Sequence, residues 1–154
     1  MLALALVTTL AAGDGESEKE PWRGPGRFCG YATVLDLADR EQLVLGEGGM
    51  HSSHYRWSGP FGAIDVSEIN WASPPDRSGR VIVETGSRRT YRKRVVSGEW
   101  QYAVWDKGHL TAYLSSNAFD GSKRDLSLVD RIALVDHAGD TAKDCKYRLV
   151  FSFG

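Results

Sequence analysis

The sequence predicts an all-β domain, built as an antiparallel β-sandwich or a small closed barrel of about nine to ten short strands with at most one short helix. Three observations favour this class. The chain contains five Trp and 17 Gly, its apolar runs are short, and apolar residues alternate with polar ones in most of those runs. A length of 154 residues fits one domain.

The charge balance excludes some classes of partner. The 19 basic and 20 acidic residues give a net charge of −1. Such a balance creates no overall field toward nucleic acid or anionic membranes. We therefore expect no nucleic-acid partner, and no motif in the sequence indicates a cofactor.

The N-terminal segment predicts export. Residues 2–12 are apolar and uncharged, which matches the hydrophobic region of a signal peptide and is too short to span a bilayer. We expect residues 1–13 to be a signal peptide, although no basic residue precedes the apolar run; a buried N-terminal helix or strand is the alternative. Residues 14–27 are acidic and contain Pro and Gly, which is typical of a flexible linker to a single β domain over 28–154. The protein would then be periplasmic or secreted, with no transmembrane segment after removal of the signal.

The two cysteines support the same location. In an exported protein, Cys29 and Cys145 are expected to form a disulfide bond. They begin the first and the last predicted strand, so the bond would close nearly the whole domain. Two free buried thiols are the alternative.

Strands are predicted in order along the first half of the chain. A β-rich run over 28–37 places Cys29, Tyr31, Thr33, Leu35 and Leu37 on one face. Further strands are expected over 42–46, 54–58, 61–72 and 80–85.

A three-stranded meander over 91–114 is the most constrained prediction. We expect a two-residue hairpin loop at Ser97-Gly98 and a three-residue loop at 106–108. Both loops place one apolar set on the same face of the sheet: Tyr91, Val95, Trp100, Tyr102, Val104, Leu110, Ala112 and Leu114. Only Lys93 conflicts with this face.

The C-terminal third is less regular. Ser122 can cap a short helix over 123–130. A strand is expected over 131–136, a polar loop over 137–144, and a half-buried final strand from Cys145 with alternating apolar residues.

The loop GEGGMHSSHYRW (46–57) contains a pair of histidines. His51 and His54 are three residues apart and would point to opposite sides of a strand, so they converge only if a turn forms between them. A zinc site also needs a third ligand, for which the candidates are Asp65, Glu68, His109 and His137. We prefer a plain Gly-rich turn; the alternative is a small metal- or His/Asp-dependent hydrolase that uses His51, His54 and Asp65.

Other catalytic patterns are weak. Ser52 and Ser53 lack an orienting third group, and no nucleophile elbow is present. Asp65 and Glu68 are interpreted as solvated surface acids on opposite faces of a strand.

A basic run over 88–94 provides the leading candidate surface. The predicted hairpin register places its cations beside aromatic residues on the face opposite the apolar set. The predicted ligand-binding residues are Arg92, Arg94, Trp105, His109 and Tyr113. Aromatic rings can stack on sugars, and Arg can bind carboxylate or phosphate with two hydrogen bonds. There are two competing interpretations of this face: it is an ordinary solvated surface, or it is buried under another segment of the chain.

These observations predict an exported, non-catalytic binding or structural module. Its expected ligand is an anionic polysaccharide, a cell-envelope polymer or a partner protein.

Overall fold

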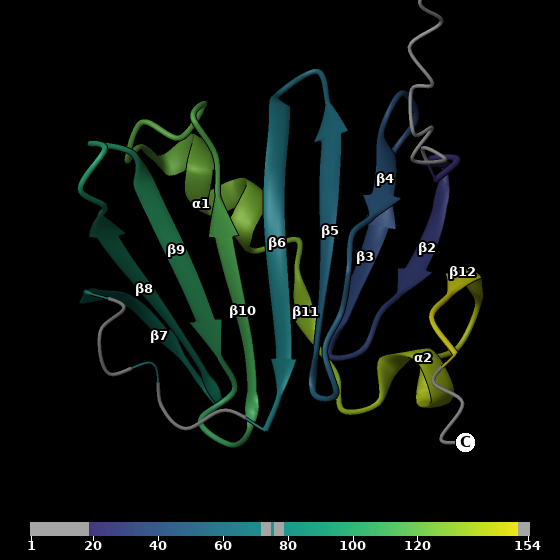
Figure 1. The fold of residues 1–154 in the computed structure, drawn as a ribbon. Helices are drawn as coiled ribbons and strands as arrows, with labels where there is room; N and C mark the ends of the chain where they lie inside the picture. The colour runs from purple at the N-terminus through teal and green to yellow at the C-terminus, as the bar shows by residue number, and fades with distance from the viewer. Residues whose placement is uncertain (1–18, 72–74, 76–78, 151–154) are drawn as a thin grey trace, which may run out of the picture.

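The protein is described by a computed structural model that covers residues 19–71, 75 and 79–150, and it consists of two β-sheets and two short helices (Figure 1). In spatial order, the larger sheet contains β1 (Trp22–Arg23), β4 (Gln42–Leu45), β5 (Ser52–Gly59), β6 (Gly62–Asn70), β10 (Leu110–Ser115), β9 (Trp100–Trp105), β8 (Arg88–Arg94) and β7 (Arg80–Thr85). The smaller sheet contains β11 (Ala133–Leu134), β3 (Thr33–Leu37), β2 (Gly26–Cys29) and β12 (Cys145–Arg148). The helices are α1 (Lys123–Val129) and α2 (Ala138–Thr141).

The predicted all-β sandwich is confirmed. The larger sheet ends in two edge strands, β1 and β7, and is therefore open rather than a closed barrel. The described residues form twelve strands and two helices, more than the nine to ten strands and single helix expected. Most of the additional elements are very short.

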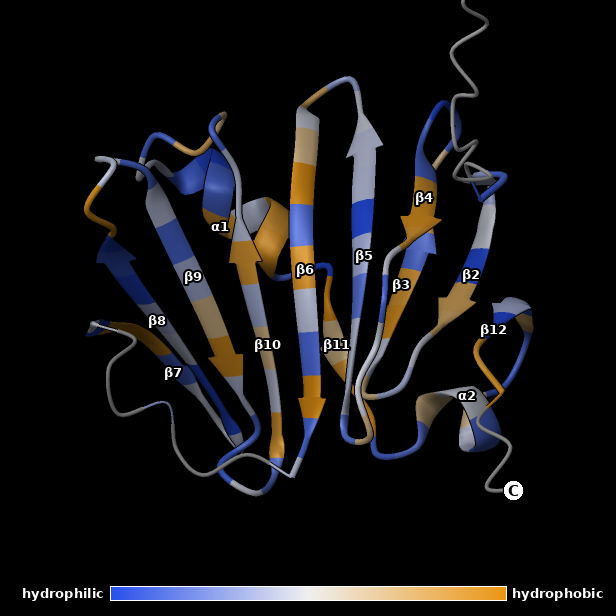
Figure 2. Ribbon diagram, in the orientation of Figure 1, coloured by the Kyte–Doolittle hydropathy of each residue, from blue (hydrophilic) through white to orange (hydrophobic). Residues whose placement is uncertain are grey.

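The core lies between the two sheets. Apolar and polar residues alternate along β5 and β6, and Figure 2 shows this as alternating bands on β6. The apolar side of these strands packs against the smaller sheet, and the buried cluster includes Phe28, Leu35, Tyr55, Trp57, Ile64 and Val66. Burying each large apolar side chain stabilises the fold by roughly 1.5–3 kcal/mol.

Helix α1 covers the other half of the same sheet face. It lies behind β9 and β10 in the view of Figure 1. Ser122 caps it as predicted, because its side chain accepts a hydrogen bond from the Arg124 N–H. Val129 is fully buried, so the helix docks through its apolar side.

The disulfide is confirmed. Cys29 and Cys145 are bonded, with their Cα atoms 5.8 Å apart across 116 residues of sequence. β12 runs parallel to β2 beside this bond. The bridge therefore joins the C-terminal segment to the first hairpin of the small sheet.

The N-terminal strands differ from the prediction. Residues 28–37 form a hairpin of β2 and β3, in which Phe28 lies opposite Leu35. The turn forms because Glu68 binds the N–H groups of Tyr31 and Ala32 at 2.6 and 3.0 Å. The expected linker 14–27 also includes β1 and the start of β2; the expected signal peptide 1–13 lies outside the described residues.

The region over 131–144 also differs from the prediction. The expected strand over 131–136 is reduced to β11, and the expected loop contains the single turn α2. The position of α2 requires glycine at residue 139, because a Cβ atom there would collide with the Leu149 carbonyl oxygen. Such close backbone contact is a tertiary feature that local pattern does not reveal.

Candidate functional site

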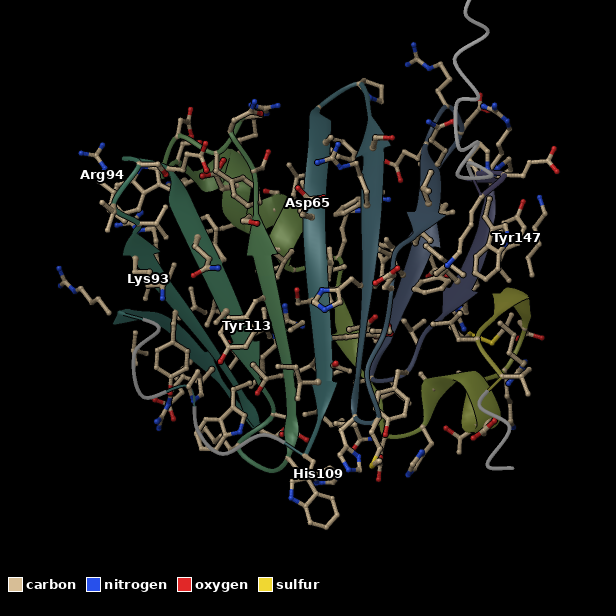
Figure 3. The ribbon with its side chains drawn as sticks, viewed as in Figure 1. Asp65, Lys93, Arg94, His109, Tyr113 and Tyr147 are labelled. Atoms are coloured by element: carbon tan, nitrogen blue, oxygen red, sulfur yellow. A yellow bond between two sulfur atoms is a disulfide. The ribbon has the colours of Figure 1, made fainter. Side chains whose placement is uncertain are left out.

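The site is built on the outer face of the larger sheet, the side that faces away from α1 and the smaller sheet. Figure 3 views this side, with Tyr113 and Asp65 labelled. The residues that point to it follow from the strand register: His54, Arg56, Asp65, Ser67, Arg89, Tyr91, Lys93, Gln101, Trp105 and Tyr113. This set is called the outer face below.

The hairpin before β9 has a different register from the predicted one. Val95 N–H donates to the Glu99 carbonyl at 2.9 Å, so the loop has three residues, 96–98, rather than two. Gly98 takes φ of +88° at the third loop position, as this loop type requires. Arg94 instead of Val95 therefore lies opposite Trp100. A shift of one residue moves every side chain of β8 to the other face.

This shift removes Arg92 and Arg94 from the predicted surface. Both guanidinium groups stack on Trp100, with 4.7 and 4.9 Å from the Arg Cζ atoms to the ring centroid. Arg92 Nη1 also donates to the Gly121 carbonyl at 2.6 Å. Arg88, on the same side, donates to the Val129 carbonyl at 2.9 Å. These alternate arginines attach the α1 segment to the sheet.

Trp105 and Tyr113 lie on the outer face as predicted. The second loop also differs in register, but by two residues: Val104 lies opposite Ala112, where the prediction had Leu110. An even shift preserves the face of each residue. His109 lies in the loop at one end of the sheet and pairs with Asp136 at 3.3 Å, so it is not part of the outer face.

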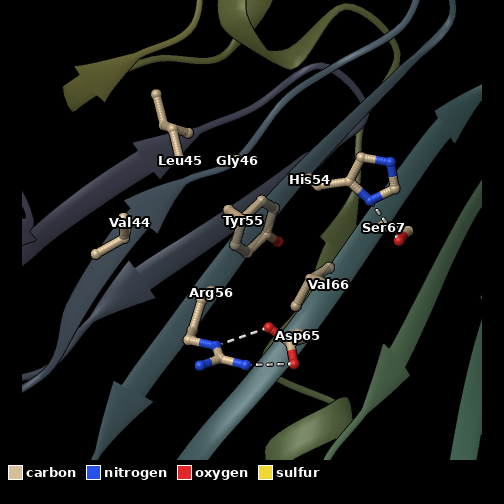
Figure 4. Close-up of a pocket in the computed structure, with 9 residues that line it drawn as sticks. All are labelled: Val44, Leu45, Gly46, His54, Tyr55, Arg56, Asp65, Val66 and Ser67. Atoms are coloured by element: carbon tan, nitrogen blue, oxygen red, sulfur yellow. Dashed lines mark hydrogen bonds and ion pairs between the residues drawn. The ribbon is translucent and has the colours of Figure 1, made fainter. Parts of the chain in front are cut away.

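The outer face is hollowed over β4, β5 and β6. Figure 4 shows this depression of about 360 Å³, which is lined by side chains from all three strands. Arg56 and Asp65 form two hydrogen bonds of 2.8 and 2.9 Å. His54 Nδ1 and Ser67 Oγ lie 2.7 Å apart. The hollow is therefore lined by two cross-strand polar pairs.

Polar atoms remain available in the hollow. Among the described residues, Arg56 Nη1 and His54 Nε2 have no hydrogen-bond partner. Arg56 and Asp65 side chains are 61% and 56% exposed. Tyr113 lies directly opposite Ser67 on the next strand. The hollow therefore holds unpaired polar nitrogens, and an aromatic residue lies on the next strand.

The outer face is more closed toward β8. Tyr91 and Ala103 are buried there, and so is Thr111. Among the residues that border this region, Glu84 accepts hydrogen bonds from both Arg89 and Lys107. The bonds from Lys107 and Arg89 lower the pKa of Glu84. Two cations therefore share one carboxylate at this edge of the face.

The alternative His51, His54 and Asp65 site is only partly assembled. His54 and Asp65 line the same hollow, but His51 packs against Trp71 with 5.5 Å between ring centroids. Across residues 19–71, 75 and 79–150, no three or more His, Cys, Asp or Glu side chains are arranged to hold a metal ion. Asp65 and Glu68 do point to opposite faces, as predicted.

Glu68 is a fully buried acid and not the solvated one expected. Its carboxylate lies between the two sheets and accepts four hydrogen bonds, from the Tyr31 and Ala32 N–H groups and the Thr33 and Ser53 hydroxyls. Thr33 Oγ1 also lies 2.9 Å from the Tyr55 hydroxyl. Because every oxygen is paired, this group stabilises the sandwich and is closed to ligands.

Glu41 is the second buried acid with a structural role. Arg131 binds it through two hydrogen bonds of 2.7 and 2.8 Å and stacks on Trp57. Burial opposes ionisation, but the bonds from Arg131 and other donors outweigh it and lower the pKa of Glu41. The charged pair therefore connects β4 to the segment after α1.

Sequence reasoning missed Ser67, Arg56 and Lys93 as members of the candidate site. Strand alternation places Arg56 and Ser67 on the same side as His54 and Asp65, and this signal was available. Lys93 reaches the outer face only in the observed register. That register depends on a loop length that the residues alone left ambiguous.

Comparison with protein-family models, with curated proteins and with solved structures finds no match to this chain. None of the helices in the described part of the chain is long and apolar enough to cross a membrane.

Proposed function

We propose that this protein is an exported binding module that recognises an anionic saccharide polymer on its outer face. The observation that carries the proposal is the hollow over β4 to β6, with unpaired nitrogens of Arg56 and His54, and with Tyr113 on the next strand opposite Ser67. Export is supported by the disulfide, since such bonds persist in oxidising compartments.

The chemistry of the hollow suits sugars. Fixed polar side chains on strands can bond ring hydroxyls and carboxylates without first being ordered. The Arg56–Asp65 pair offers both hydrogen-bond donors and acceptors. Within each of the two polar pairs, the hydrogen bonds hold the two side chains in place. An aromatic ring beside such groups stacks on the apolar face of a sugar.

The charge of the surrounding face favours an acidic sugar. Arg89 and Lys107 place two cations against the single carboxylate of Glu84 at the β7–β8 edge of the same face. Arg binds carboxylates with two parallel hydrogen bonds. We therefore expect stronger binding of uronic-acid polymers than of neutral glucans, with affinity that falls as salt is added.

The test is binding of the folded domain to a panel of purified polysaccharides by isothermal titration calorimetry. The panel contains polygalacturonate, alginate and hyaluronan, with dextran as a neutral control. Tyr113→Ala and Arg56→Ala are each expected to weaken binding about tenfold or more, as for a central contact residue. Arg94→Ala is the matched control, because Arg94 lies on the opposite face.

Two outcomes contradict the proposal. One is that no acidic polymer binds at millimolar sugar concentration. The other is that Arg94→Ala weakens binding as much as Arg56→Ala. Capture of a protein by the outer face, with no polysaccharide bound, would identify a protein partner instead.

A hydrolase is the second candidate, favoured by one observation. Ser67 Oγ lies 2.7 Å from His54 Nδ1 in an open hollow, as a nucleophile and its base do. The third group is missing, since Asp65 bonds Arg56 instead of His54. The surrounding N–H groups belong to paired strands, which leaves none for an oxyanion hole. Labelling of Ser67 by a fluorophosphonate, lost in His54→Ala, would favour this candidate; no labelling excludes it.

A further inference from the structure

One end of the sandwich gathers a cluster of imidazoles around a carboxylate. His109 Nε2 lies 3.3 Å from Asp136 Oδ2, and His137 Nε2 lies 3.5 Å from Asp136 Oδ1. Asn70 Nδ2 donates to Asp136 Oδ1 at 2.8 Å. Figure 3 shows His109 at this end of the sheet. A single carboxylate therefore contacts three side chains.

These side chains come from separate parts of the chain. Asn70 ends β6, His109 lies in the loop between β9 and β10, and His137 precedes α2. Asp136 thus joins the end of the larger sheet to the segment that leads to the disulfide at Cys145. The side chains of His109, Asp136 and His137 are each about half exposed, so protons can reach them from solvent.

The loop that carries His109 accepts hydrogen bonds from two neighbouring tryptophans. Trp71 N–H donates to the His109 carbonyl at 2.9 Å. Trp71 has φ of +120° and is 78% exposed, a conformation that its surroundings must maintain. Trp105 Nε1 donates to the Gly108 carbonyl at 3.0 Å. Movement of this loop therefore changes Trp105 on the outer face.

We propose that Asp136 is a pH-sensitive latch on the β9–β10 loop. The latch is closed when His109 carries a proton, because its ion pair with Asp136 then holds the loop to the segment before α2 and to Asn70 of β6, which binds the same carboxylate. His137, the next residue in the chain, adds its charge beside Asp136. The latch loosens when the His109 imidazole is neutral. Histidine ordinarily changes charge between about pH 5 and 8.

Asp136 keeps its charge through that range. Burial opposes ionisation, but hydrogen bonds from Asn70 and His109 and the charges of both histidines hold the pKa of Asp136 below its usual value. The carboxylate therefore loses its contribution to the latch only in acid, as the pH falls through this lowered pKa. At higher pH the charge of the His109 imidazole decides the state of the latch.

The neighbouring tyrosine stays neutral over the same range. The ring of Tyr31 meets His137 edge-on, with 6.2 Å between centroids. Burial raises the pKa of Tyr31, and the charges of Asp136 and Glu68 raise it further. Tyr31 therefore contributes shape and no charge.

The remaining charged groups at this end have other contacts. Asp106 accepts hydrogen bonds from the Gly108 and Leu110 N–H groups in its own loop. Lys107 pairs with Glu84. The partners of the Asp136 carboxylate do not include two further titratable groups at this end. These are His51, which lies beside Trp71, and Asp140, which lies in the first turn of α2.

The test follows the loop by NMR in the absence of any ligand. Protection of the Trp71 amide against hydrogen exchange and the Trp105 indole N–H shift are measured at about pH 5.5 and 7.5. We expect up to about fivefold higher Trp71 protection at the lower pH, the upper size expected for one half-exposed ion pair. Asp136→Asn should reduce that ratio to below about twofold.

His54→Gln is the matched control, because it removes an exposed histidine that contacts no carboxylate; it should keep the wild-type ratio. A wild-type ratio in Asp136→Asn overturns the proposal, as does one in His109→Gln combined with His137→Gln. The double histidine variant tests the latch even if Asp136→Asn does not fold. The effect of the latch on binding rests on the proposed function, but this experiment does not, so either can fail alone.

Discussion

Replacing Glu68 with Gln tests the idea that this buried carboxylate holds the sandwich together. Each Glu68 oxygen accepts one backbone N–H and one hydroxyl hydrogen bond. A Gln side chain keeps one acceptor oxygen and turns an NH₂ group toward the other pair. The hydroxyl there can rotate, but the backbone N–H cannot and is left unpaired.

The expected loss is about 2–4 kcal/mol in the free energy of unfolding. An unpaired buried donor costs about 1–3 kcal/mol, and the remaining bonds lose the strength that the charge provided. Urea denaturation followed by tryptophan fluorescence measures the loss, with an unchanged slope if the unfolded state is unaltered.

Asp65→Asn is the matched control on the same strand. Asp65 is exposed and pairs only with Arg56, so its replacement should cost less than about 1 kcal/mol. The reasoning is refuted if Glu68→Gln unfolds within about 0.5 kcal/mol of wild type, or if the control costs as much as Glu68→Gln.

Three further predictions concern stability. Arg131→Ala should lower the free energy of unfolding by about 3–5 kcal/mol, because it leaves Glu41 charged and buried. The Arg131 pair lowers the pKa of Glu41, so the difference from wild type should shrink as the pH falls below 4.5. Urea melts between neutral and acid pH measure this difference. Replacing Cys29 and Cys145 with Ser should cost about 4.7 kcal/mol on the chain-entropy model for a loop of about 100 residues, and abolish the response to reductant. Gly98→Ala should cost about 1–2 kcal/mol because of its positive φ, and an unchanged urea midpoint would contradict the three-residue loop.

Local alternation made much of the fold predictable. Each of the strands β5, β6, β9 and β10 has one apolar face and one solvent face. Alternation with a period of two residues therefore indicates both that the segment is a strand and which of its side chains point to the core. The cap at Ser122 is also a local signal, because its acceptor bonds the N–H two residues along. The bond between Cys29 and Cys145 was predictable from chemistry and position.

Register was harder to predict than strand identity. The loop before β9 fits two or three residues about equally well in sequence, yet the choice decides whether Arg92 or Lys93 faces outward. Trp105 and Tyr113 therefore lie on the face that was predicted for them and Arg92 and Arg94 do not, while ligand binding by this surface stays a prediction. The register across the loop between β9 and β10 differs from the prediction by two residues, which leaves each side chain on its predicted face.

The sequence by itself determined the class of fold, the pairing of the cysteines and the outward aromatic residues of the meander, because these depend on neighbours within one or two strands. Only the tertiary structure decided that β2 and β3 form a hairpin around Glu68. It also decided that the basic run splits between two faces, and that Asp136 meets two histidines. The hairpin around Glu68 and the meeting of His109 with Asp136 depend on contacts between separate segments of the chain, and local pattern carries no record of such contacts. The split of the basic run depends on the length of the loop before β9, which the residues alone leave ambiguous.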